Sequence, residues 1–217
     1  EMSTPITNAF MRHISFIAHA YIHEDPANRR DTIPVDLARI WHRVSKLVGR
    51  PPVLSYKSYA LDNWQLIRGS EPVALGNIGL LNNFYGGLDE EWFVLVHIDI
   101  EAKAAPIVKI VPESQQAVLD NDLEKLEKCL EVILSAQTEM LATLKRMPEN
   151  CDPYIYFNRV RPFIHGWERR PIIYEGVEEY GGQLQRFRGE TGAQSSIVPT
   201  LDALLGIYHV PNEMTKY

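Results

Sequence analysis

The sequence predicts a mainly α-helical protein, and three observations favour that class. Apolar residues recur at helical spacing over residues 34–48, 122–147 and 195–205. Residues that start or stop helices bound these segments. The chain also lacks internal repeats and low-complexity tracts, and its 217 residues suffice for one good core or two modest ones.

Two helices are expected in the first fifty residues. The first covers residues 10–23. The second begins at Pro34, whose fixed φ suits a first helical turn, and ends at Val48, because Gly49 and two prolines follow. The composition changes at residues 49–52, so we expect the boundary between a small N-terminal helical part and a larger helical part there.

Two further helices are expected in the larger part. The longer one runs from Asp122 to Met147 and ends before Pro148. Its apolar face is formed by Leu123, Leu126, Leu130, Ile133, Leu134, Leu141 and Leu144. A later helix is capped by Ser195 or Ser196 and tolerates Pro199 in its first turn. Its apolar positions are Ile197, Leu201, Leu204 and Leu205.

Residues 94–100 are ambiguous by their pattern alone, and the two chain ends are unlike those of a complete protein. VLVHIDI at 94–100 alternates as a strand would, but periodicity alone cannot assign so short an apolar run. Glu1 is not an initiator methionine, and PNEMTKY at 211–217 is typical of a helix start capped by Asn212. We therefore expect this chain to be the middle of a longer protein, incomplete at both ends.

Composition limits the classes of function. A net charge of −6 gives no electrostatic case for binding nucleic acid or an anionic membrane. No apolar run reaches the length of a membrane span, and no segment is typical of a signal peptide. Cys129 and Cys151 lack the spacing of a metal site and fit a reducing compartment. We expect a cytoplasmic protein.

Residues 154–207 carry the strongest functional signal. YIYFNRVRPFIHGW is followed by GETGAQSS at 189–196 and then by an apolar helix. Arg161 can grip a carboxylate, because a guanidinium offers two parallel donors. The small residues of GETGAQSS let the backbone approach a ligand closely. The residues alone predict a pocket for an anionic ligand with a flat apolar body, and the alternative is a purely structural loop.

The motif blocks point to a known family. RVRPFIHGW, YEGV and GETGAQSSIVPTLDALLGI, in that order, resemble the indoleamine 2,3-dioxygenase family, haem enzymes that open the indole ring of tryptophan. PPVLSYKSYALDNW and WFVLVHIDIEAKAAPIVKIVP extend the resemblance upstream to Pro51. It implies a helix over 94–100 and a helical haem-dioxygenase fold. Residues 1–50 would be part of a small N-terminal domain, and 51–217 part of a large haem- and substrate-binding domain.

The resemblance also implies roles for individual residues. His97 falls at the distal position above the haem iron, where many members carry serine, and its imidazole would accept a hydrogen bond from the indole N–H. Of Arg159 and Arg161, only Arg161 matches the arginine that holds the substrate carboxylate. Thr191 falls near a haem propionate and the substrate ammonium. The expected catalytic, substrate-binding and cofactor-binding residues are His97, Arg161, Thr191, Tyr56, Phe93, Tyr156, Phe157, Glu190 and Gly192.

Structural readings of the same residues stay open. His97 could be an ordinary core histidine, and the aromatic residues could be plain core packing. Glu190 replaces a glycine that is common in the family, which leaves the shape of its loop open. His19 and His23 form an i, i+4 pair that lacks a third metal ligand, so we expect a partly exposed helix face there. None of the seven histidines matches the axial haem ligand, which is expected beyond Tyr217.

The function implied by the resemblance is a haem b dioxygenase. It would insert both atoms of O2 across the indole C2–C3 bond of L-tryptophan, or of a close indole derivative, to give N-formylkynurenine. One alternative is another indole oxidation by the same superfamily, as in pyrrolnitrin biosynthesis. A second is a haem- or indole-binding protein without turnover. The expected partners are a small-molecule substrate and O2, and the expected oligomeric state is a monomer.

Overall fold

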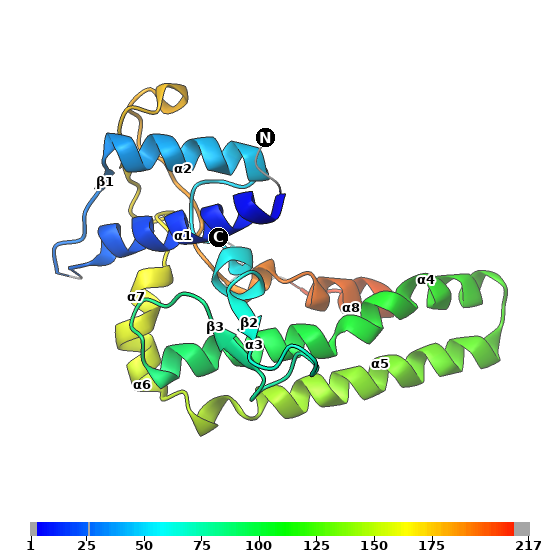
Figure 1. The fold of residues 1–217 in the computed structure, drawn as a ribbon. Helices are drawn as coiled ribbons and strands as arrows, with labels where there is room; N and C mark the ends of the chain where they lie inside the picture. The colour runs from blue at the N-terminus through cyan, green and yellow to red at the C-terminus, as the bar shows by residue number, and fades with distance from the viewer. Residues whose placement is uncertain (1–3, 26, 211–217) are drawn as a thin grey trace.

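The computed structural model describes residues 4–25 and 27–210, and helices dominate it (Figure 1). The predicted mainly α class is confirmed. The longer helices are α1 Thr4–His23, α2 Val35–Val48, α3 Leu88–Lys103, α4 Ala105–Leu119, α5 Leu123–Leu144 and α8 Ile197–Leu205. Short helical turns are η1 Lys57–Leu61, η2 Met147–Glu149, α6 Pro153–Ile155, η3 Tyr156–Val160, α7 Arg161–Ile164, η4 Glu178–Tyr180 and η5 Gly192–Gln194. The strands are β1 Thr32–Ile33, β2 Trp64–Leu66, β3 Ile78–Leu80 and β4 Ile173–Tyr174.

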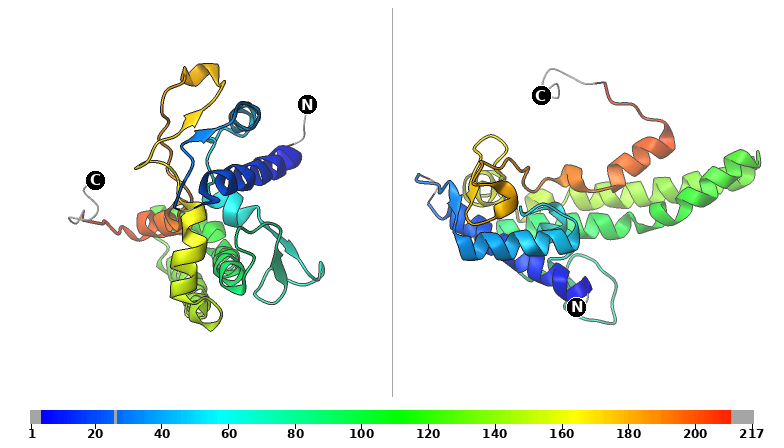
Figure 2. Two further views of the ribbon diagram at one scale, coloured as in Figure 1. Left: turned by 90° about the vertical axis from the view of Figure 1, so that its left-hand side faces the viewer. Right: turned by 90° about the horizontal axis from the view of Figure 1, so that it is seen from above.

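Helices α1 and α2 pack side by side, and a hydrophobic core lies against them (Figures 1 and 2). α2 ends where the sequence predicts, because Gly49 adopts a left-handed conformation with φ of 66° and its N–H caps the helix. The core combines residues of these helices, such as Trp41, with Trp167 and Tyr174 from much later in the chain. β1 pairs with β4 in parallel beside this core. The domain boundary at 49–52 stays a prediction.

Helices α3, α4 and α5 form an elongated arm that extends away from the α1–α2 pair (Figures 1 and 2). α4 follows α3 after Ala104, and α5 packs against both. The residues that α5 buries are Cys129, Ile133, Ala136 and Thr143. The predicted apolar face of α5 is wrong for five of its seven members, since Leu123, Leu130, Leu134, Leu141 and Leu144 are exposed. The contact with α3 and α4 uses a narrow neighbouring stripe of small and β-branched residues instead.

The other helix predictions differ from the structure mainly at their ends. The strand-like segment 94–100 lies inside α3, so its assignment to a helix is confirmed. α1 begins at Thr4 rather than Phe10, with Pro5 in its first turn. Helix α4 was not among the predicted helices; Pro106 lies in its first turn, and Pro112 is accommodated inside the helix.

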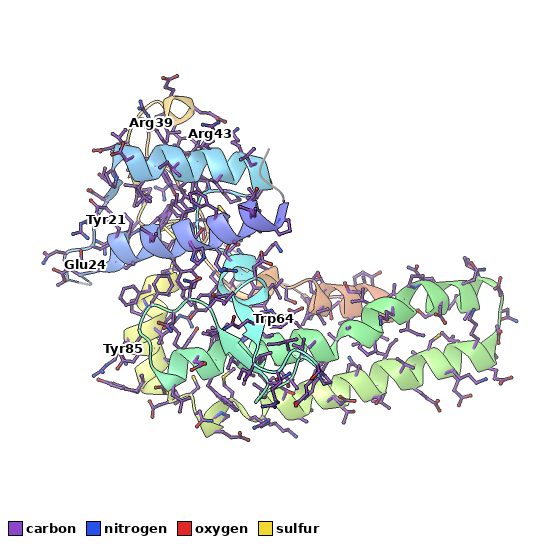
Figure 3. The ribbon with its side chains drawn as sticks, viewed as in Figure 1. Tyr21, Glu24, Arg39, Arg43, Trp64 and Tyr85 are labelled. Atoms are coloured by element: carbon purple, nitrogen blue, oxygen red, sulfur yellow. The ribbon has the colours of Figure 1, made fainter. Side chains whose placement is uncertain are left out.

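Three smaller features complete the fold. The hairpin of β2 and β3 packs on α3, with Trp64 paired to Leu80, and Figure 3 labels Trp64 beside that helix. Ser196 occupies the N-cap position of α8, while the hydroxyl of Ser195 accepts the Ile197 N–H at 3.2 Å. The expected cap at Asn212 lies outside the described residues. No helix within residues 4–25 and 27–210 is long and apolar enough to cross a membrane.

Candidate functional site

His97 lies on α3, and aromatic side chains from α3 and from two other segments surround it. Phe93 precedes His97 by one helical turn, and the two rings have centroids 4.4 Å apart. The Phe93 ring also stacks on Tyr156 of η3 at 4.1 Å, and Tyr56 meets the His97 ring edge-on at 6.1 Å. The Tyr56 hydroxyl donates to Glu101 Oε1 at 3.0 Å, one turn further along α3. The structure thus brings together four of the predicted site residues.

The protonation of His97 follows from its hydrogen bond. Its Nδ1 lies 2.8 Å from the backbone carbonyl oxygen of Phe93, and a carbonyl can only accept, so Nδ1 carries the proton. Burial lowers the pKa of His97, and the ring is neutral at pH 7. Nε2 therefore has a free lone pair and makes no hydrogen bond with any residue in the described parts of the chain. The ring can accept a hydrogen bond from a ligand.

A second group of predicted residues lines a cavity of about 830 Å³. Arg161, Phe157, Glu190 and Thr191 all contribute to its wall. The Arg161 Nε lies 3.3 Å from His165 Nε2, and the guanidinium carbon lies 6.0 Å from the centre of the Phe157 ring. Within the described residues, the two terminal nitrogens of Arg161 have no hydrogen-bond or ion-pair partner. They are available to a carboxylate.

The loop at residues 189–194 joins the two groups. A Cβ on Gly192 would lie 3.9 Å from His97 Nε2, while its neighbours Glu190 and Thr191 line the cavity with Arg161. The loop is held on the His97 side because Gln194 Oε1 accepts the Tyr56 N–H at 2.7 Å. Its own turn is closed by the Thr191 hydroxyl, which accepts the Ala193 N–H at 3.3 Å.

Gly166 and Gly189, which were not among the predicted site residues, fix the position where this loop begins. A Cβ on Gly166 would lie 2.1 Å from Gly189 N, and a Cβ on Gly189 would lie 2.1 Å from Gly166 N. Only glycine fits at either position, because the two backbones cross in direct contact. This crossing holds the loop against the segment that carries Arg161. Gln194 was also passed over, although it stands inside the GETGAQSS block.

Glu190 adds a carboxyl group to the site. Burial raises its pKa to about 7, and the positive charge of Arg161 opposes that rise. Burial and nearby carboxylates, including Glu190, raise the pKa of Tyr56, and burial and then Glu190 raise that of Tyr156. Both phenols are therefore neutral hydrogen-bond donors at pH 7. Thr191, Gly192 and Phe157 lie at the exposed edge of the site.

The side chains of His19 and His23 are more buried than the sequence predicts. Both side chains are buried, so the expected partly exposed helix face is wrong. His19 bridges the Leu54 N–H and the Phe163 carbonyl, and His23 contacts the His165 carbonyl at 3.0 Å. No cluster of metal-ligating side chains occurs within residues 4–25 and 27–210. The two histidines anchor α1 to the segment that carries Arg161.

The residues present fit the distal side of the haem that the resemblance implies. Gly192 has no side chain where His97 Nε2 points, which leaves room for a flat ring. Phe93 and Tyr156 supply an aromatic wall, and the neighbouring cavity is rich in arginines that suit carboxylates such as propionates. The described residues thus offer a distal face and anion-binding groups.

Comparison with known proteins gives a consistent result. A family model described as indoleamine 2,3-dioxygenase matches residues 7–216. The chain is 33% identical over 202 residues to indoleamine 2,3-dioxygenase 1 of Rattus norvegicus, covering 90% of this chain and 49% of the rat protein. It is 32% identical over 215 residues to the indoleamine 2,3-dioxygenase of Saccharomyces cerevisiae, covering 92% of this chain and 46% of the yeast protein. A 6-hydroxytryptophan 2,3-dioxygenase of Fusarium equiseti is 28% identical over 214 residues, covering 94% of this chain and 52% of that protein. The chain spans about half the length of the curated relatives it matches.

Proposed function

We propose that this chain, which belongs to the indoleamine 2,3-dioxygenase family, is the distal, substrate-binding part of a haem b dioxygenase. Its substrate is L-tryptophan or a close indole derivative, and its product is the corresponding N-formylkynurenine. The small-molecule substrate and O2 are the partners that the site chemistry requires. We also propose that the protein acts as a cytoplasmic monomer.

The observation that carries this proposal is the free acceptor on His97. Because Nδ1 is committed to the Phe93 carbonyl, the neutral ring presents only Nε2 to a ligand. An indole N–H is a donor without an acceptor, so the two groups match. A hydrogen bond at this point fixes which edge of the indole faces the centre of the site. His97 therefore orients the ring that is to be opened.

The other residues hold the rest of an aromatic amino acid. The terminal nitrogens of Arg161 bind the carboxylate as a two-donor fork. The hydroxyl of Thr191 assists the ammonium group at the mouth of the site. The stacked rings of Phe93 and Tyr156 form an aromatic wall against which the indole lies, and Phe157 covers the exposed side. Holding the substrate in a fixed orientation is one way in which such side chains raise the rate.

The cofactor would lie against the side of the loop that Gly192 leaves open. Phe93 and Gly192 would contact its flat face, and Glu190 and Thr191 would stand near a propionate edge. A haem held there supplies the oxygen chemistry, by which both atoms of O2 enter the indole C2–C3 bond. The chain's own residues bind the substrate, keep the indole nitrogen hydrogen-bonded, and exclude water from the ring.

Isotope labelling of the product tests the proposal. The complete protein, loaded with haem and kept reduced, is supplied with L-tryptophan under ¹⁸O2, and the product is analysed by mass spectrometry. We expect two labelled oxygen atoms in each molecule of N-formylkynurenine. A product with one labelled atom would favour another indole oxidation of the same superfamily, and tryptophan binding without any product would favour a binding protein. Either result would reject the dioxygenase function.

A further inference from the structure

The cavity that contains Arg161 has an excess of positive charge. Its wall includes five arginines and two histidines but only two carboxylates. One of these, Glu168, is already paired, since its Oε1 lies 3.0 Å from Arg188 Nε. Burial raises the pKa of the other, Glu190, to about 7, so it is partly protonated near neutral pH. Such a wall concentrates anions inside the cavity.

Among the described residues, Arg29 is the arginine of this cavity that has buried nitrogen atoms without a hydrogen-bond partner. It follows α1 in the chain, and its Nη1 donates to the Arg170 carbonyl at 3.0 Å, which fixes one end of the guanidinium. Its Nε and Nη2 are buried and have no hydrogen-bond partner among residues 4–25 and 27–210. Buried polar atoms in native proteins are almost always paired, so these two donors need an acceptor that the described residues do not supply.

The geometry of the two unpaired donors is specific. Nε and Nη2 point their N–H bonds in parallel along one edge of the guanidinium, which is the edge that binds two oxygens of one oxyanion. Arg161 lines the same cavity, but its Nε lies 3.3 Å from His165 Nε2, so only its two terminal nitrogens are free. The two arginines therefore offer two different sets of donors.

The surroundings of Arg29 do not neutralise it. Burial lowers the pKa of Arg29, and the charge of Arg170 adds to that effect, while Asp31 opposes it. Asp31 makes no ion pair with Arg29 in the described parts of the chain, and its Oδ1 accepts the Thr32 hydroxyl at 3.1 Å. Burial lowers the pKa of His23 to about 4, and the charge of Arg29 adds to the effect. The neighbouring histidine therefore stays neutral and adds no positive charge to that of the arginines.

We propose that Arg29, with Arg170 and His165 beside it, forms a second anion-binding site in this cavity, which we call the Arg29 subsite. Its ligand is an oxyanion, either a phosphate or a carboxylate, held by the Nε–Nη2 edge. The flanking residues Asn28 and Arg30 are exposed, so the segment that carries Arg29 lies at the protein surface. The oxyanion can come from a free small molecule or from a propionate of the bound cofactor, and the two sources are distinguishable.

Inorganic phosphate is the probe, titrated calorimetrically into the complete protein with and without haem at low ionic strength. Because no turnover is measured, the result does not depend on the proposed dioxygenase function. Loss of a two-donor charged contact weakens binding by about tenfold or more, which is the effect we expect for Arg29→Gln. Arg29→Lys keeps the charge but not the paired donors, and we expect an intermediate loss.

The matched control is Arg30→Gln, which removes the same charge from the adjacent residue. Arg30 pairs with Glu24 at 2.6 Å and lies over the Tyr21 ring, and Figure 3 labels both partners at the outer end of α1. It does not line the cavity, so phosphate affinity should stay within about twofold of wild type. Equal losses in Arg29→Gln and Arg30→Gln would overturn the proposal, as would wild-type protein without saturable phosphate binding.

A second measurement covers the case in which Arg29→Gln fails to fold. Phosphate should raise the Tm of the wild-type protein more than chloride does at the same ionic strength, because a ligand of the native state stabilises it. Equal shifts with the two salts would show screening alone and would overturn the proposal. If haem loading abolishes phosphate binding, the oxyanion is a cofactor propionate. If phosphate still binds to the haem-loaded protein, the subsite takes a free oxyanion.

Discussion

His19 joins the N-terminal helices to both sides of the candidate site, and its replacement has a calculable cost. Its Nε2 accepts the Leu54 N–H at 2.9 Å, and its Nδ1–H donates to the Phe163 carbonyl at 2.8 Å. His19→Leu keeps a similar volume but leaves both backbone groups buried and unpaired. Each such group costs about 1–3 kcal/mol, so the free energy of unfolding should fall by about 2–6 kcal/mol. That is a large share of the roughly 5–15 kcal/mol that stabilises a typical domain.

Urea denaturation followed by tryptophan fluorescence measures this loss directly, because the His19 ring lies 4.8 Å from the buried Trp167 ring. The control is His13→Gln on the exposed side of the same helix, which should change the unfolding free energy by less than about 0.5 kcal/mol. A loss below about 1 kcal/mol in His19→Leu would refute the reasoning, since it would mean that water or a shifted backbone satisfies both groups.

The same residue makes stability depend on pH. Burial lowers the pKa of His19 to about 3, and protonating Nε2 would also remove the acceptor for Leu54. The unfolded chain, with a histidine pKa near 6.5, therefore binds more protons between these values. Stability should be complete above pH 6.5 and fall as the pH drops, by about 2 kcal/mol at pH 5 from this group. In His19→Leu, the slope of unfolding free energy against pH should decrease by the equivalent of about one bound proton. An unchanged slope would refute the assignment of this pH dependence to His19.

Three further predictions concern the candidate site in the complete, haem-loaded protein. Arg161→Ala should weaken tryptophan binding by about 2–5 kcal/mol, because the carboxylate loses its two-donor partner. Arg159→Ala, whose side chain instead donates to the Tyr85 hydroxyl, should leave KM near wild type. His97→Ser should retain activity and reduce the preference for tryptophan over 1-methyltryptophan, which has no indole N–H; an unchanged ratio of kcat/KM values would exclude contact with the indole nitrogen. Glu190→Gln should raise Tm at pH 8 but not at pH 4, because a carboxyl whose folded pKa is about 7 favours the folded state less as pH rises from 4.5 to 7. Equal Tm shifts at the two pH values would contradict the burial of that carboxyl.

The helices could be predicted where local chemistry sets them. α2 ends at Gly49 because a left-handed residue stops a helix, and Asp122 caps α5 through its own side chain, which accepts the Lys125 N–H at 3.0 Å. Helix faces could not be predicted as well. The leucines of α5 have the right spacing, but the helix buries Cys129, Ile133, Ala136 and Thr143, of which only Ile133 belongs to the predicted face. Which stripe is buried depends on the partner helices, and a single segment does not encode them.

The sequence by itself determined the types of residue in the candidate site. Its motif blocks contain His97, Arg161 and Thr191, and their resemblance to the family implies an aromatic amino acid as the ligand. Only the tertiary structure decided which of their polar atoms remain free. His97 presents Nε2 because the Phe93 carbonyl takes Nδ1, and Arg29 keeps an unpaired edge because Arg170 takes only its Nη1. The Arg29 contact joins residues far apart in the chain, and the facing of His97 and Gly192 depends on the crossing of two glycine backbones. The Arg29 hydrogen bond forms only when distant segments meet, so no local pattern of residues could have shown it, whereas the His97 hydrogen bond to Phe93 lies within one turn of α3.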